Sequence, residues 1–515
     1  MAPATKKSSP DLRIPAEVRV AIIGHWTPEQ EKLMAPAVKA IQAELEEVLH
    51  QTPATFTLVP GLSQDAERLW ESKDFSFPSL TQALIHYLPG ESRRYFRSFK
   101  TVRERTTFFK AVRAATENLP STPDAERGAA EQAIRDCEVL IAFWTPPSAL
   151  SPAGVAPLIR FALESAGRTL YWIDPATGET KRYDNYDRII DSFMHLNRYN
   201  RALVNPARIA SEVRSQIKRL DDLASEAGFS AALLDPLHER VIPHFVRAER
   251  LAAFWQRCYI LAGSAIYLFA ALGVASGTIA ILVPQEEMAF VEVASMALIL
   301  IIIGVSETVE VLRCWLDYRF LAERLRASIH LYVAGMSSKM SDEDSGQWMS
   351  RALRWICLPK QQQPMAGSLE AAKYFTRKGW VEDQRNYYFQ RSGEFELWQK
   401  WSLRLGFVLF VTAAGTAFSH ALHWFHAPKV LAGTAIIAAA LGASMAGFRA
   451  FREFHRTALQ YVGMVRKLNH IASRIKQAAT PEDLKDLLAQ ADDAIIQEHQ
   501  GWRVLVHVHE PIDEL

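Results

Sequence analysis

Three acidic residues stand inside or beside long apolar runs of this sequence. Glu292 is the one charged residue between Met288 and Ser306, and Glu307 and Glu310 follow that run, ahead of Arg313. A spacing of three places Glu307 and Glu310 on one face of a helix. Carboxylates at such depths line ion pathways in membrane proteins, so these three are the candidate pore-lining residues. The alternative is that Glu307 and Glu310 reach interfacial water or pair with Arg313.

Four apolar segments have the length that a membrane span needs, about 20 residues. They run from Cys258 to Gln285, from Met288 to Ser306, from Leu405 to Phe425 and from Val430 to Phe448. Short connectors join the first to the second and the third to the fourth, so the sequence predicts two helical hairpins. Small residues are frequent in the fourth span, which suits either packing within the chain or a subunit interface.

Basic residues mark the same side of all four spans. Arginines and lysines flank the ends that lead away from the hairpin tips: Arg240, Arg247, Arg250, Arg257, Arg313, Arg319, Arg324, Arg326, Lys400, Arg404, Arg449, Arg452 and Arg456. Of the lysines and arginines, the two hairpin tips contain only Lys429. The positive-inside rule therefore predicts a multi-pass protein of the inner (cell) membrane with both termini in the cytoplasm. The polar N-terminal stretch contains no apolar signal segment, which agrees with a cytoplasmic N-terminus.

Composition excludes several classes of function. The net charge is +1, so no global positive field favours a nucleic-acid polymer as partner. The four cysteines, Cys137, Cys258, Cys314 and Cys357, lack the spacing of metal ligands. The sequence therefore predicts no metal, no cofactor and no disulfide framework.

Short buried-type strands alternate with helices in the first third of the chain. The strand candidates are "VRVAIIGHW" (18–26), "TFTLVPGL", "CEVLIAFWT" (137–145) and "TLYWID". This alternation predicts parallel βαβ units in a doubly wound sheet. The predicted fold class is thus an α/β domain followed by an all-α membrane part with helical extensions. In such sheets, ligands bind at the carboxyl ends of the strands.

The segments at those strand ends resemble the SLOG superfamily of Rossmann-like nucleotide-binding domains. The resemblance covers about residues 17–175 and rests on "GHW", "GLSQDAER", "LPGESRRYFRSF", "CEVLIAFWTPP" and "SPAGVAP", in that order. It implies a nucleotide or cyclic-nucleotide ligand and the following binding residues: Gly24, His25, Gly61, Asp65, Arg68, Arg93, Trp144 and Gly154.

The chain also departs from that pattern. Trp26 replaces a basic residue, Asp65 replaces a glycine, and the glycine-rich turn retains only Gly154. Turn glycines let backbone amides approach a phosphate at a helix N-terminus, so their loss argues against hydrolytic chemistry, and no catalytic residue is assigned. His25 is either a general base or a structural residue, and Arg68 and Arg93 are either phosphate ligands or solvated helix-face arginines.

The membrane half resembles the SLATT families of two-span effectors over about residues 240–510. The resemblance rests on an "AE.LR" pattern (Ala322, Glu323, Leu325, Arg326) and on "DQ…YY" (Asp383, Gln384, Tyr387, Tyr388). It implies an effector of bacterial conflict and antiphage systems that perforates the inner membrane when a SLOG domain senses a nucleotide signal.

The sequence therefore favours a homo-oligomeric membrane effector whose nucleotide-binding domain gates a pore or membrane disruption. The alternatives are a membrane-anchored nucleotide-processing enzyme and a non-enzymatic transporter or scaffold. The expected organisation is a disordered tail (1–16), a SLOG-like domain (17–185), a helical connector (186–257), a first hairpin (258–312), a cytoplasmic helical segment (313–404), a second hairpin (405–448) and a C-terminal helical region (449–515).

Overall fold

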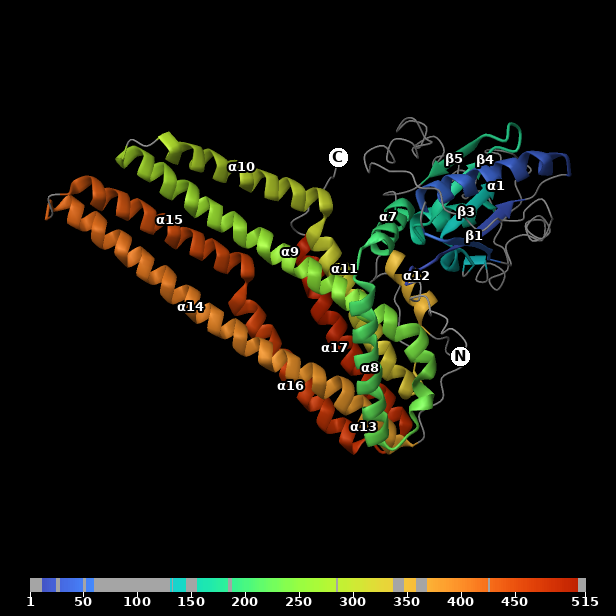
Figure 1. Ribbon diagram of the computed structural model, residues 1–515. Coiled ribbons are helices and arrows are strands. Elements are labelled where there is room, and N and C mark those ends of the chain that lie inside the picture. The colour runs from blue at the N-terminus through green and yellow to red at the C-terminus, as the bar shows by residue number, and fades with distance from the viewer. Residues whose placement is uncertain are drawn as a thin grey trace, which may run out of the picture. The chain divides into compact units, whose positions relative to one another are not determined.

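The computed structural model describes residues 12–24, 28–49, 52–59, 130–131, 133–144, 155–183, 188–283, 286–336, 347–357, 368–424 and 427–507. The chain forms two compact units (Figure 1). Unit 1 comprises Met1–Leu203 and Met340–Ile356, and unit 2 comprises Val204–Lys339 and Cys357–Leu515. The chain therefore passes from one unit to the other three times.

Unit 1 contains a five-stranded sheet in the order β2-β1-β3-β4-β5. The strands are β1 (Ala16–Gly24), β2 (Ala54–Leu58), β3 (Val139–Phe143), β4 (Thr169–Ile173) and β5 (Thr180–Tyr183). The first four pair in parallel, which confirms the predicted α/β class, and β5 pairs antiparallel with β4. Sequence analysis missed β5, because "TKRY" carries no apolar run.

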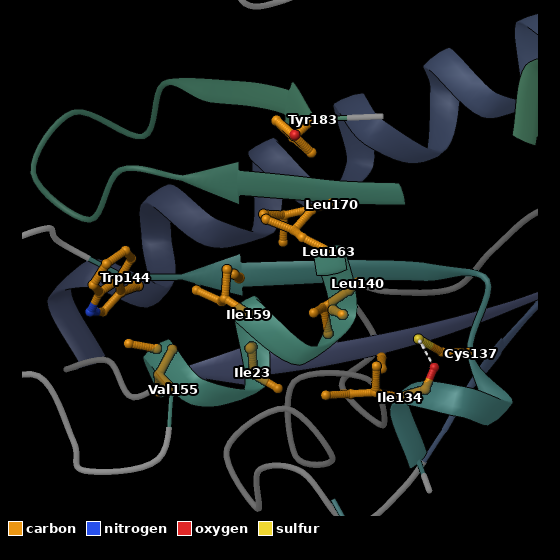
Figure 2. Close-up of a cluster of buried hydrophobic side chains, with 14 residues drawn as sticks. Ile23, Ile134, Cys137, Leu140, Trp144, Val155, Ile159, Leu163, Leu170 and Tyr183 are labelled. Carbon is orange, nitrogen blue, oxygen red and sulfur yellow. Dashed lines mark hydrogen bonds between the residues drawn. The ribbon is translucent and has the colours of Figure 1, made fainter. Parts of the chain in front are cut away.

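Helices α1 (Pro28–Leu49), α6 (Val155–Arg160), α7 (Arg188–Arg201) and α12 (Gln347–Ile356) belong to the same unit. One apolar cluster joins β1, β3 and β4 to α6 and its π-helical continuation, Phe161–Ser165 (Figure 2). Buried amides tie α7 to the N-terminal segment, since Asn200 exchanges hydrogen bonds with the backbone of Ile14 at 2.9 Å in each direction. The amide oxygen of Asn197 accepts a hydrogen bond of 2.6 Å from the Thr52 hydroxyl.

Helix α12 lies between two segments of unit 2 in the sequence but packs against α7 and β1 of unit 1. Arg351 is fully buried there and donates to Glu138 at 2.8 Å and to Ser192 at 3.2 Å. Its guanidinium carbon lies 4.5 Å from the ring centroid of Phe193. Arg354 donates a second bond of 2.7 Å to the same Glu138 oxygen. A buried, paired arginine thus anchors this inserted helix to the α/β unit.

Unit 2 is helical throughout the part that the structure describes. Its helices are α8 (Pro206–Ala227), α9 (Asp235–Leu282), α10 (Glu286–Val309), α11 (Val311–Val333), α13 (Leu369–Thr376), α14 (Glu382–Ala421), α15 (Pro428–Arg452), α16 (Phe454–Gln477) and α17 (Pro481–His507). Four stretches are long and apolar enough to cross a membrane: Ala231–Leu282, Glu287–Val309, Leu369–Ala421 and Pro428–Gln477. Each overlaps one of the four predicted spans, of which the first and third were predicted to end three to four residues later than the helices do. The two hairpins are visible in Figure 1.

The two hairpins share one architecture. In each, a long helix (α9 or α14) carries a returning span (α10 or α15) and then a further helix (α11 or α16) packed on the same long helix. A single glutamate in the left-handed conformation separates the second span from that further helix: Glu310 (φ 52°) in the first hairpin and Glu453 (φ 45°) in the second. The repeat is one of backbone path, and no matching run of residues accompanies it.

This break corrects one expectation. Helix α10 ends at Val309, and Glu310 stands between helices with left-handed backbone angles. Glu307 and Glu310 therefore do not share one face of a continuous helix. The chain turns at Glu310. The carbonyl oxygen of Glu310 accepts the first hydrogen bond of α11, at 3.0 Å from the backbone amide of Cys314.

Candidate functional site

The carboxyl edge of the sheet contains two of the predicted ligand-binding residues. Gly24 ends β1 in register with Phe143 of β3, and Trp144 follows Phe143 directly. Gly24 has φ 130°, and a Cβ there would lie 2.2 Å from the Phe143 carbonyl oxygen, so only glycine fits this close approach. The other six residues, His25, Gly61, Asp65, Arg68, Arg93 and Gly154, lie outside the described residues.

Trp144 helps to close the apolar cluster rather than standing open at the edge. It is 3% exposed and packs beyond the end of β3 beside Val155, the first residue of α6 (Figure 2). Its carbonyl oxygen accepts a hydrogen bond of 2.5 Å from the indole nitrogen of Trp172 on the next strand. Backbone and indole thus fix the ends of β3 and β4 relative to each other.

Cys137, just before β3, should resist modification. Burial raises the pKa of its thiol to about 12, and the thiol donates to the Ile134 carbonyl at 3.3 Å. Only the thiolate reacts with alkylating agents. We expect iodoacetamide at pH 8 to leave Cys137 unlabelled in the folded protein and to label it after denaturation, as measured by mass spectrometry. Labelling of the native protein at the rate of the denatured chain would contradict this environment.

Among the described residues, no three or more His, Cys, Asp or Glu side chains gather in a cluster that could hold a metal ion.

The candidate acidic residues of the spans occupy three different settings. Glu292 is half-buried between α10 and α9, where its carboxylate lies against Gly277. Glu307 is exposed on the last turn of α10, and Glu310 is half-buried at the break that follows.

Glycines allow the two hairpins to pack closely through α9 and α15. A Cβ at Gly263 would lie 2.1 Å from the ring of Phe451, and a Cβ at Gly447 would lie 2.5 Å from the ring of Tyr267. A Cβ at Gly433 would meet Leu282 at 2.2 Å. Large side chains of each helix thus rest on glycines of the other, as in small-residue helix packing in membranes. These contacts lie within one chain and show that glycines of the fourth span pack against the first.

The two motifs that carry the resemblance to two-span effectors meet below the spans. Glu323 and Arg326 of α11 and Asp383, Gln384 and Tyr387 of α14 line one polar cavity. Arg326 binds Glu323 at 2.7 Å and Glu249 of α9 at 2.8 Å. Sequence analysis gave no role to these residues. The two motifs are about 60 positions apart in the chain, so the sequence alone did not predict that they meet.

A buried histidine lies close to this junction. His330 of α11 stacks on Trp380, with the ring planes 1° apart and the centroids 6.0 Å apart, and it also contacts Phe375. Burial lowers its pKa to about 3, with repulsion from Arg219 and Arg326 adding to the effect. The imidazole is therefore neutral at physiological pH.

This histidine predicts a loss of stability in mild acid. The pKa of His330 is lower in the folded state than in the unfolded state, so the unfolded state takes up a proton as the pH falls through about 6.5. Between pH 7 and pH 5, the wild type should lose about 2 kcal/mol more than His330→Phe, which keeps the ring stack. The free energy of unfolding in detergent micelles measures this difference. Equal losses in both proteins would show that His330 already binds a proton when folded.

Fold and site together define a class: a multi-pass membrane protein with an α/β unit and two paired helical hairpins. Residues 377–502 match the family model described as "SMODS and SLOG-associating 2TM effector domain 1". The match covers 126 of 515 residues and takes in α14, α15, α16 and most of α17. The second hairpin and its extensions are therefore similar to a two-span effector domain. No curated protein and no solved structure matches the chain.

Proposed function

We propose that this chain is a membrane effector in which unit 1 senses a nucleotide-derived signal and unit 2 responds by forming a pore or disrupting the bilayer. The effector is a homo-oligomer in the cell membrane with both termini in the cytoplasm, and it acts in a conflict system of the abortive-infection type. In this proposal the ligand binds at the carboxyl edge of the sheet, and Glu292, Glu307 and Glu310 line the ion pathway.

The observation that carries the proposal is the build of the second hairpin. Residues 377–502 match a two-span effector domain, and the first hairpin repeats the same backbone path. The helices α10 and α14 expose large apolar side chains that only lipid or a second chain would cover, among them Phe290, Leu300, Ile301, Phe407 and Phe410. A glutamate at a left-handed break between span and extension gives each hairpin a defined place to bend.

Gating needs a ligand that favours one state over another. The chain joins unit 1 to unit 2 at three places, after Leu203 and on both sides of Met340–Ile356. In this proposal, a change in unit 1 reaches unit 2 along the chain at these crossings, of which the first leads directly into α8, the second follows α11 and the third precedes α13. Three covalent connections support a mechanism in which the α/β unit biases the helical unit.

Reconstitution tests the proposal directly. The full chain is incorporated into vesicles of phosphatidylethanolamine and phosphatidylglycerol that contain potassium ions and a fluorescent dye. Cyclic AMP, cyclic GMP, cyclic di-AMP and cyclic tri-AMP are then added singly. We expect one of these compounds to release potassium, with empty vesicles and the protein without nucleotide as controls.

The pattern of release separates the outcomes. Release of potassium without dye indicates a pore, and Glu307→Gln should then change its preference for cations over anions. Release of both indicates bilayer disruption. Consumption of the nucleotide without any release would favour a membrane-anchored enzyme and contradict the proposal, and no release with any of the four compounds would also count against it.

A further inference from the structure

The cavity below the spans has the size and the composition of a ligand site. Its volume is about 600 Å³, within the range of small-molecule pockets. Helices α8, α9, α11 and α14 form its walls, so it lies where the two hairpins and the helix entering unit 2 meet. Four arginines face it, Arg219, Arg319, Arg326 and Arg391, together with three carboxylates, Glu249, Glu323 and Asp383.

The carboxylates are committed to the end of the cavity that is distant from the membrane. Glu249 and Glu323 both bind Arg326, and Asp383 lies 3.6 Å from Arg219. The side chain of Arg326 is 17% exposed, and its guanidinium group is already paired with two carboxylates. That end of the cavity is an ion-pair network, and it leaves little positive charge for a ligand.

The end nearer the spans has a different balance. Arg319 and Arg391 line it with the amide of Gln256 and the rings of Trp315 and Tyr387. A smaller adjoining cavity of about 110 Å³ shares Gln256, Tyr387 and Arg391, and its further lining residues include Arg452, Glu394 and Trp398. The two cavities thus bring three arginines close to the point where the hairpins leave the membrane.

Three carboxylates act on these arginines: Glu394, Glu498 and Glu323. Glu394 binds Arg391 at 2.8 Å, with both side chains about half exposed, so the pair is weak. Glu498, Glu323 and the hydroxyls of Tyr387 and Tyr461 interact with Arg319, and Glu323 is shared with Arg326. Arg452 lies over the rings of Phe395 and Phe454, with centroid distances of 6.0 and 5.4 Å. The carboxylate partners of these arginines are thus either half exposed or shared with another group, and the guanidinium groups of Arg391 and Arg452 lie over aromatic rings.

We propose that this end of the cavity binds a phosphate group. Guanidinium forks match the geometry of phosphate oxygens, and the amide of Gln256 adds a neutral donor. The aromatic walls accommodate the rest of the ligand, either the glycerol backbone of an anionic phospholipid or the organic part of a soluble phosphate compound. Basic pockets between helices at the membrane boundary bind anionic lipid headgroups elsewhere. A bound phosphate would bridge α11 to α14 and so hold the two hairpins together.

Lipid titration of the purified full chain tests this site, and the test needs no membrane leakage. Native mass spectrometry follows binding of phosphatidylglycerol and, in a separate arm, of phosphatidylcholine, while calorimetry follows binding of inorganic pyrophosphate. We expect one saturable site that Arg319→Gln together with Arg391→Gln weakens at least tenfold. Arg385→Gln is the matched control, because Arg385 lies on α14 next to Asn469 and does not line either cavity.

Each outcome decides the proposal. Saturable binding of phosphatidylglycerol alone, or of pyrophosphate alone, supports the site and identifies the source of the phosphate. If neither binds, or if the double variant binds as the wild type does, the cavity is a structural network of ion pairs and the proposal is wrong. Should the double variant fail to fold, Arg391→Gln decides alone, because its side chain is 44% exposed and its loss leaves the packing intact.

Discussion

Replacing Arg351 with methionine should release α12 from the α/β unit. Arg351 is fully buried, and its removal leaves Glu138, which is 8% exposed, without its buried cation. Breaking a buried ion pair from one side costs about 3–5 kcal/mol, and we expect about 3 kcal/mol because Arg354 keeps its own contact with Glu138. Amide hydrogens of α12 should then exchange about two orders of magnitude faster in the full chain, as measured by hydrogen-exchange mass spectrometry.

Two variants control for this prediction. Arg354→Met removes the outer partner, whose side chain is 27% exposed, and should change exchange in α12 much less. Glu138→Gln combined with Arg351→Met removes both buried charges and should recover part of the lost protection. Unchanged exchange of α12 in Arg351→Met would show that the contacts between Trp348 and Tyr199, with centroids 5.6 Å apart, hold the helix without the ion pair.

The elements that periodicity and length define could be predicted from the sequence. The β-branched runs ending at Gly24 and Phe143 became neighbouring parallel strands, and each of the four apolar segments coincides, to within a few residues at its end, with part of a membrane-length helix. These features depend on local composition, because a buried parallel strand and a membrane span both need an uninterrupted apolar run.

Features that depend on distant residues could not be predicted. Nothing near Glu310 or Glu453 marks a helix break, since neither has a glycine or proline beside it, yet both adopt left-handed backbone angles. The place of α12 depends on Arg351 meeting a carboxylate 213 positions earlier. The candidate cavity likewise needs α11 and α14 to come together, although resemblance had already singled out Glu323, Arg326 and Tyr387 from its wall.

A methyl group at the glycines between α9 and α15 should separate the two hairpins. In Gly263→Ala the new Cβ would lie 2.1 Å from the Phe451 ring, and in Gly447→Ala it would lie 2.5 Å from the Tyr267 ring. Overpacking of this kind costs about 1–3 kcal/mol per site, and the sites belong to one interface, so the double variant should lose more than either single variant. Unfolding in mixed detergent micelles, followed by circular dichroism, measures the loss.

Glycines in the other span of each hairpin serve as matched controls. Gly304 of α10 and Gly415 of α14 meet no atom within 4 Å, so Gly304→Ala and Gly415→Ala should leave the chain as stable as the wild type, or slightly more stable. If the proposed function holds, the interface variants should also alter nucleotide-triggered leakage while these controls do not. Loss of leakage in Gly304→Ala with unchanged stability would indicate instead that a second chain packs on α10 in the active assembly. Equal stability of all four variants would instead show that the rings of Phe451 and Tyr267 move aside, and that the hairpins do not depend on this close approach.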